Sequence, residues 1–212
     1  MKNILMIGAH YDDVELGCAG TALKLIEQGC NVYKITLTDN EFEEKNYGFI
    51  ISKSESTKSS IKSCDFLGIK ELDFKQQKYG ELSYNKAVMQ EIENIIIDLK
   101  IDTVFFHHKS DMHHDHEVAY EISKTAARHC NNIFTYQSNG YILDNAFAPN
   151  LFFDITDQIN KKIKALNFYD ENQKEQNRQG RLFDICIKRN EIWGYGNHVG
   201  YAEGFQVIKY ML

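Results

Sequence analysis

The chain has 212 residues, of which 43% are apolar and 25% are charged, and its formal net charge is −6. This length and composition are typical of one ordinary globular domain, so we expect residues 1–212 to form a single domain. The negative charge and the lack of any basic block argue against a nucleic-acid-binding surface.

The five cysteines are widely separated, and no two of them form a Cys-x-x-Cys pair. They are typical of thiols in a reducing compartment, and not of a disulfide framework or a thiolate metal site. The apolar run near the amino end is shorter than the ~7–15 residues of a signal-peptide core, and no apolar stretch approaches the ~20 residues that span a bilayer. We therefore expect a cytoplasmic protein without a membrane span.

Short apolar segments alternate along the chain with longer segments of helical periodicity. Strands are predicted at residues 4–7, 31–37, 70–74, 102–106, 133–136, 150–155 and 204–209. Helices are predicted at residues 21–28, 54–67, 85–99, 117–129, 156–169 and 182–193. Because strands and helices alternate, the pattern predicts an α/β fold with a mostly parallel sheet and helices on both faces.

Several details of these elements are also predicted. Ile61, Cys64 and Leu67 recur at helical spacing, which indicates the inner face of the second helix. Thr156 is expected to cap the fifth helix, and Gly194 is expected to end the last one. The polar segments 38–48 and 172–180 are predicted to be loops, and the second is either simply solvated or a mobile flap over a site.

Three polar side chains follow the first predicted strand at once. Gly8 and Ala9 allow the backbone to turn, and then come His10, Asp12 and Asp13. Open α/β sheets bind their ligands at the carboxyl ends of strands. Because successive side chains point in different directions, His10 and Asp13 can face one ion while Asp12 faces something else.

A second polar cluster follows the strand predicted at residues 102–106. Five of the eight histidines fall within ten residues: His107, His108, His113, His114 and His116. A single histidine in a polar loop is usually just solvated, but this set also contains Asp111 and Asp115. Since both clusters follow strands of one predicted sheet, we expect them to converge on one crevice.

Residues 10–17 (HYDDVELG) and 113–116 (HHDH) resemble the two signature motifs of the LmbE/PIG-L family of metal-dependent N-deacetylases, and residues 201–205 (YAEGF) resemble a third segment. The resemblance implies a Rossmann-like fold and removal of acetyl groups from N-acetylated sugars and related amides. It also implies site residues, which are the metal ligands His10, Asp13 and His116, the general base Asp12, and His113 oriented by Asp115. It assigns no substrate-binding residues.

The chain departs from the family pattern at two positions. Tyr11 and His114 stand where the family usually has proline, and Pro149 is the only proline in the chain. No chemical group is lost by these replacements. Tyr11 is expected to narrow the mouth of the site.

The implied residues supply each role that amide hydrolysis requires. Two histidines and one carboxylate leave open positions on a metal, as in catalytic zinc sites, and Fe²⁺ would suit the same ligands. Asp12 can take a proton from metal-activated water, and His113 can stabilise the oxyanion or protonate the amine. Asp115 is expected to hold one ring nitrogen of His113 and to favour its charged form.

The partner implied is a small N-acetylated substrate, and a homo-oligomer is compatible with the sequence. A deacylase of a non-sugar N-acyl amide or of an N-formyl sugar is the nearest alternative function. Two histidines and a carboxylate also form the metal triad of non-haem iron oxygenases, although an α/β pattern argues against that class. A non-catalytic nucleotide-binding module is a further alternative, but the first turn lacks G-x-G-x-x-G.

Overall fold

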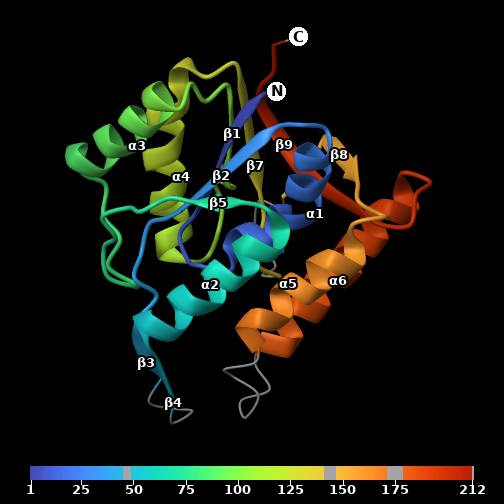
Figure 1. Cartoon of the computed structure of the whole chain (residues 1–212), viewed down its shortest axis with the longest axis horizontal. Coiled ribbons are helices and arrows are strands. Elements are labelled where there is room, and N and C mark those ends of the chain that lie inside the picture. The colour runs from blue at the N-terminus through green and yellow to red at the C-terminus, as the bar shows by residue number, and fades with distance from the viewer. Residues whose placement is uncertain (45–48, 141–146, 171–178, 212) are drawn as a thin grey trace.

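The structure, a computed structural model, describes residues 1–44, 49–140, 147–170 and 179–211, and its centre is a seven-stranded sheet (Figure 1). The strand order is β5 (Lys70–Glu71), β2 (Asn31–Thr36), β1 (Asn3–Gly8), β6 (Thr103–His107), β7 (Asn132–Tyr136), β9 (Ala202–Lys209) and β8 (Leu151–Asp154). The first five strands run parallel. β9 is antiparallel to both of its neighbours. The predicted, mostly parallel α/β fold is confirmed.

Helices cover both faces of this sheet (Figure 1). They are α1 (Asp13–Glu27), α2 (Lys53–Leu67), α3 (Lys86–Asp98), α4 (His114–Ala126), α5 (Ile159–Asp170) and α6 (Gln179–Gly196). One core cluster joins β1 and β6 to α3 and α4, while another joins the same strands to α1, α2 and α5. None of the helices in the described part of the chain has both the length and the apolar character that a membrane crossing requires.

The first helix begins eight residues before the predicted start, at Asp13 instead of residue 21. Gly17 and Gly20, which precede the predicted start, both lie inside α1. A Cβ atom added at Gly17 would lie 2.8 Å from Cγ of Tyr136, and one at Gly20 would lie 2.7 Å from Cβ of Ile155. The two glycines therefore permit close packing of α1 on its neighbours, and Asp12 becomes the N-cap residue of the helix.

The second helix agrees with its predicted bounds but not with its predicted inner face. Ile61 is 49% exposed, so only Cys64 and Leu67 of the predicted apolar set are buried. The remaining buried positions on α2 are serines: Ser56, Ser59, Ser60 and Ser63. The segment predicted as a loop at 38–48 contains β3 (Phe42–Glu44), which pairs with β4 (Phe49–Ile51).

Three further helix boundaries differ from the predictions. α4 begins at His114, three residues early, and is followed by a 3₁₀ turn at Ala127–His129. α5 begins at Ile159, because Thr156 accepts hydrogen bonds from Gly200 and Tyr201 instead of capping the helix. α6 continues past Gly194 to residue 196. Most of the predicted loop or flap at 172–180 lies outside the described residues, and α6 includes its last two positions.

We predict that Gly17→Ala destabilises the fold. The new methyl group would collide with the Tyr136 ring, which cannot move aside easily because its hydroxyl donates a 2.8 Å hydrogen bond to the Ile7 carbonyl. Overpacking of this kind typically costs about 1–3 kcal/mol, which urea unfolding followed by circular dichroism would measure. Gly196→Ala is the matched control, since no neighbouring side chain or backbone atom of the described residues lies within 4 Å of the added methyl group. Equal unfolding midpoints for the two variants would contradict the packing argument.

Candidate active site

His10 and Asp13 are brought together by the turn that joins β1 to α1. The backbone N–H of His10 donates a 2.7 Å hydrogen bond to Oδ2 of Asp13. Both side chains are buried, with 6% and 2% of their residue surface exposed. The turn between the strand and the helix is therefore closed by one of the side chains that the sequence implied as a ligand.

His116 reaches the same point from the first turns of α4. Its Nε2 lies 3.1 Å from Nδ1 of His10 and 3.3 Å from Oδ1 of Asp13, and Nδ1 of His10 lies 3.4 Å from Oδ2 of Asp13. Tetrahedral zinc with bonds of about 2.0–2.1 Å to nitrogen and oxygen separates its donor atoms by about 3.3 Å. One nitrogen of each histidine and the two oxygens of Asp13 thus lie close together, and their chemistry fits one divalent ion.

Two neighbouring histidines enlarge this set of donors. Among the described residues, potential ligand atoms lie within 4.8 Å of one another in two groups, which are His10 with His113 and His116, and Asp13 with His107 and His116. His116 belongs to both groups. His107 was part of the predicted histidine cluster but received no role there.

The other ring nitrogen of His116 is held by a chain of polar contacts. Nδ1 of His116 lies 3.0 Å from Asp111, whose two oxygens accept 2.6 and 2.7 Å hydrogen bonds from Nδ2 of Asn139. The guanidinium of Arg189 on α6 donates to the backbone carbonyls of Asn139 and Gln137. Sequence reasoning missed Asn139 and Arg189, because nothing in their local spacing connects them with the histidines.

The carboxylates around His116 favour a positive charge on its ring. Burial alone would lower the pKa of His116, but the charge of Asp13 and the hydrogen bonds that His116 donates to Asp111 and Asp13 raise it to about 10. Burial alone would raise the pKa of Asp111, but the hydrogen bond and charge of His116 lower it to about 2. Two carboxylates thus flank one imidazole, and the pocket favours a positive charge in that place.

Asp12 occupies the N-cap position of α1, beside this cluster. Its side chain makes no capping hydrogen bond, and the residue is partly exposed. Burial of the carboxyl group, followed by the charge of Asp13, raises the pKa of Asp12 to about 6. The carboxylate is therefore free to exchange a proton with a molecule at the site.

His113 is the N-cap residue of α4. Its Nδ1 accepts a 3.2 Å hydrogen bond from the backbone N–H of Asp115, so its Nε2 carries the hydrogen and lies 3.2 Å from the hydroxyl of Tyr79. Burial, followed by the charges of His10 and His116, lowers the pKa of His113 to about 4. The imidazole is therefore a neutral hydrogen-bond donor, and the expectation that its charged form is favoured was wrong.

The predicted contact between the Asp115 carboxylate and His113 was also wrong. That carboxylate instead contacts Nε2 of His10 at 3.1 Å and accepts hydrogen bonds from the N–H groups of Gly80 and Leu82 at 2.7 and 3.1 Å. The start of α4 turns the Asp115 side chain away from the cap and toward the β1 turn. Asp115 thus orients His10, and only its backbone orients His113.

Tyr11 lies outside the mouth of the site, contrary to expectation. Its ring packs with Leu16 and Tyr169 in a third core cluster, and its hydroxyl contacts Thr57 and Gln76 at 2.9 and 2.8 Å. The carbonyl of Tyr11 accepts a 2.6 Å hydrogen bond from the buried amine of Lys34. Tyr11 therefore anchors the turn between β1 and α1 through contacts with α2 and α5.

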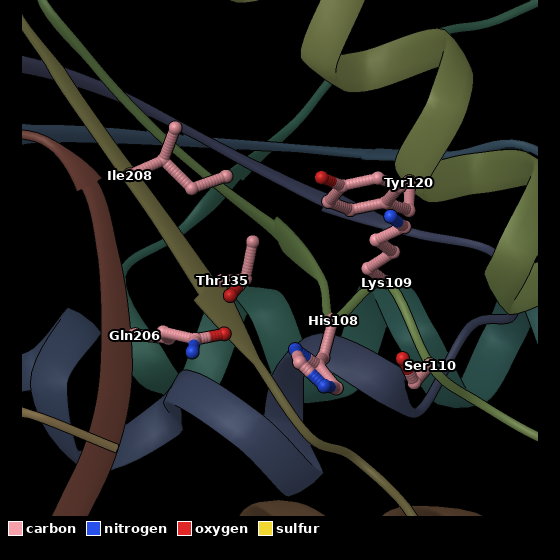
Figure 2. A pocket seen from close by; sticks show the side chains of 7 residues that line it. All are labelled: His108, Lys109, Ser110, Tyr120, Thr135, Gln206 and Ile208. Carbon is pink, nitrogen blue, oxygen red and sulfur yellow. The ribbon is translucent and has the colours of Figure 1, made fainter. Parts of the chain in front are cut away.

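Figure 2 shows a cavity that is separate from the cluster of His10, Asp13 and His116. It measures about 280 Å³ and is lined by His108, Lys109, Ser110, Tyr120, Thr135, Gln206 and Ile208. None of the six site residues that the sequence implied lines this cavity. His108 therefore lines this cavity, whereas its neighbour His107 faces the ligand cluster of His10, Asp13 and His116.

A family model described as PIG-L, GlcNAc-PI de-N-acetylase, matches residues 5–127, a span that contains both motifs. The chain belongs to the PIG-L family. The predicted resemblance is confirmed, and membership places the chain among deacetylase enzymes. An uncharacterised deacetylase of Escherichia coli strain K12, YaiS, is 28% identical to this PIG-L family chain in an alignment of 171 positions, which covers 78% of this chain and 89% of that protein.

Two solved structures resemble this PIG-L family member over nearly its whole length. An N,N′-diacetylchitobiose deacetylase from Pyrococcus horikoshii has a TM-score of 0.82 at 21% identity and covers 98% of this chain and 84% of its own. A 4-carboxy-2-hydroxymuconate hydratase from Pseudomonas putida KT2440 has a TM-score of 0.81 at 16% identity, with 100% and 98% covered. At such identities the likeness establishes the fold, which can carry more than one chemistry.

We predict that Lys34→Met destabilises the protein by about 3–5 kcal/mol, the usual cost of breaking one side of a buried ion pair. The amine of Lys34 lies 2.9 and 3.0 Å from the two oxygens of Glu15, and both side chains are fully buried. Unfolding in urea would measure the loss. Lys124→Met is the control, since its ion pair with Glu121 is exposed and such pairs contribute only about 0–1 kcal/mol. A similar loss in both variants would refute the prediction.

Proposed function

We propose that this protein is a divalent-metal-dependent hydrolase that removes the acetyl group from an N-acetylated amino sugar or its conjugate, and that residues 1–212 form one such domain. The observation that carries the proposal is the convergence of His10, Asp13 and His116. The two histidine nitrogens lie 3.1 Å apart, and each lies 3.3–3.4 Å from one oxygen of Asp13. Zinc and Fe²⁺ both suit this ligand set.

In the proposed reaction, an ion held by these three residues would polarise the amide carbonyl and increase the acidity of a neighbouring water. Asp12 takes the proton of the attacking water, because its carboxylate is adjacent to the ligand Asp13 and makes no capping bond. It then returns that proton to the amide nitrogen as the carbon–nitrogen bond breaks. The products are acetate and a free amine.

His113 acts on the carbonyl oxygen in this proposal. Its Nε2–H points toward the hydroxyl of Tyr79 at 3.2 Å, and its ring centre lies 4.6 Å from that of His10. A substrate oxygen beside the ligands can replace the Tyr79 hydroxyl as the acceptor. A neutral donor fixed by a helix cap is suited to stabilise the negative charge that develops on that oxygen.

The sugar part of the proposal is supported by the family description, which names a GlcNAc-containing substrate, and by the likeness to a diacetylchitobiose deacetylase. The likeness to a hydratase favours a second candidate, the addition of water to a carbon–carbon double bond. Such a hydration also consumes one water but releases no acetate.

The test is a panel of N-acetylated sugars and nucleotide sugars, followed by mass spectrometry for loss of one acetyl group and by an assay for acetate. N-formyl sugars, a non-sugar N-acetyl amide and an unsaturated dicarboxylic acid form the other arms. Each is assayed with the Zn²⁺-loaded protein, the Fe²⁺-loaded protein and His116→Ala. Acetate release from sugars alone, lost in His116→Ala, is the expected result. Hydration of the unsaturated acid without any acetate release would overturn the proposal.

Asp12→Asn should keep the metal and lose the base. Removal of a general base typically lowers turnover by about 10²–10⁴-fold, and the neutral amide has the same shape as the carboxylate. Elemental analysis and turnover are measured together, with Asp157→Asn as a surface control. A metal-free Asp12→Asn would show that Asp12 is itself a ligand.

His113→Asn should lower turnover by about 10²–10³-fold, the usual cost of one oxyanion donor. Asparagine is used because it can still cap α4, so the loss reports on the missing Nε2–H and not on the helix. KM and metal content should change little. Tyr79→Phe, which removes the hydroxyl beside Nε2 of His113, should show a smaller loss. If His113→Asn loses the ion, His113 is a ligand, as one of the two donor groups allows.

A further inference from the structure

His107, the last residue of β6, has a fully buried side chain directed at the ligand cluster. Its Nε2 lies 3.0 Å from Oδ2 of Asp13. Its ring stacks on that of His116, with centres 4.0 Å apart and planes 18° apart. It therefore contacts two of the three proposed ligands, although neither motif includes it.

We propose that His107 is a positioning residue for the metal site, which donates a hydrogen bond from Nε2 to Asp13 and does not bind the ion itself. This inference rests on the proposed metal site at His10, Asp13 and His116. In this role, His107 determines which oxygen of Asp13 is available to an ion.

The contacts of Asp13 divide between its two oxygens. Oδ2 accepts the backbone N–H of His10 at 2.7 Å and lies 3.0 Å from Nε2 of His107. Oδ1 lies 3.3 Å from Nε2 of His116. A carboxylate oxygen has two lone pairs, so two N–H donors occupy Oδ2. Oδ1 is left facing the histidine ligand, and this favours binding of the ion through that oxygen alone.

The contact with Asp13 indicates which ring nitrogen of His107 carries the hydrogen. Nδ1 is buried and has no hydrogen-bond partner among the described residues, so neither tautomer gains a contact there. If His107 used the Nε2 lone pair to bind an ion, the hydrogen of the neutral ring would move to Nδ1, and the hydrogen bond to Asp13 would be lost. With the hydrogen on Nε2, the Asp13 carboxylate accepts it.

The backbone N–H of Ala9 also approaches Nε2 of His107, at 3.1 Å. It would favour the opposite tautomer, in which Nε2 accepts. A hydrogen bond to a charged carboxylate is roughly twice as strong as one between neutral groups, so Asp13 decides the tautomer. The N–H of Ala9 then loses Nε2 of His107 as an acceptor, and this loss is a consequence of holding the carboxylate in place.

The test compares three variants at His107 by their affinity for Zn²⁺, measured in competition with a coloured chelator. His107→Gln places an N–H the same number of bonds from the backbone as Nε2, and its affinity should stay near that of the wild type. His107→Phe keeps a flat ring but removes the donor. His107→Asn keeps a donor that is too short to reach Asp13. Both should bind Zn²⁺ about 10–100-fold more weakly, as is typical when a partner of a ligand is lost.

His108→Phe is the control, because the neighbouring histidine lines the separate cavity, and its Zn²⁺ affinity should be unchanged. The visible absorption bands of the Co²⁺-loaded Phe variant should match those of the wild type at saturation, since the ligand set is the same. The thermal stability of the metal-free variants checks their folding, and the Gln–Asn pair suffices if Phe does not fold.

The outcomes distinguish failure of the positioning role of His107 from failure of the proposed metal-dependent function. Equal affinities of the Gln and Asn variants would overturn the positioning role. Altered Co²⁺ bands together with weak binding in the Gln variant would show that His107 is a ligand. If the wild type binds no divalent ion, the proposed function itself fails. If the wild type binds the ion, His116→Ala does not, and all His107 variants do, the proposed function stands and only the positioning role fails.

Discussion

The buried carboxylate of Asp13 is the contact on which the arrangement of the site depends. Its partners come from the β1 turn, the end of β6 and the start of α4. Burial alone would raise the pKa of Asp13, but the charge of His116 and the hydrogen bonds from His10 and His107 hold it well below its usual range. The group therefore stays charged inside the protein, and it joins the β1 turn to two segments that lie about a hundred residues further along the chain.

Two buried lysines support this arrangement from the other side of α1. Lys34 donates to the carbonyl of Tyr11 and pairs with Glu15, while Lys162 donates to the carbonyl of Leu16 at 2.8 Å and pairs with Glu203 at 2.6 Å. Burying charges is costly unless they are paired and hydrogen-bonded, and here each lysine satisfies a backbone carbonyl as well as a carboxylate. The first turns of α1 are thus held by charge where a serine-rich α2 offers little apolar surface.

The sequence predicted the alternation of strands and helices and the meeting of the two clusters, because apolar periodicity and the parallel-sheet rule are local signals. It did not predict that α1 contains Gly17, since glycines occur both in turns and where a helix packs closely on its neighbour, and the local sequence does not distinguish the two. Nor did it reveal that Asp115 faces His10 instead of His113. That preference depends on how the start of α4 directs each side chain, which no spacing along the chain encodes.

Both helices that enter the site begin at a residue to which we assign chemistry, and neither start is optimal for the helix. Asp12 belongs to the best capping residue types yet makes no capping bond, and α4 is capped by a histidine ring. Helix stability has been given up at both positions. Selection for heat resistance alone would be expected to rebuild these two caps, and the more thermostable variants would lose the turnover that we propose Asp12 and His113 provide.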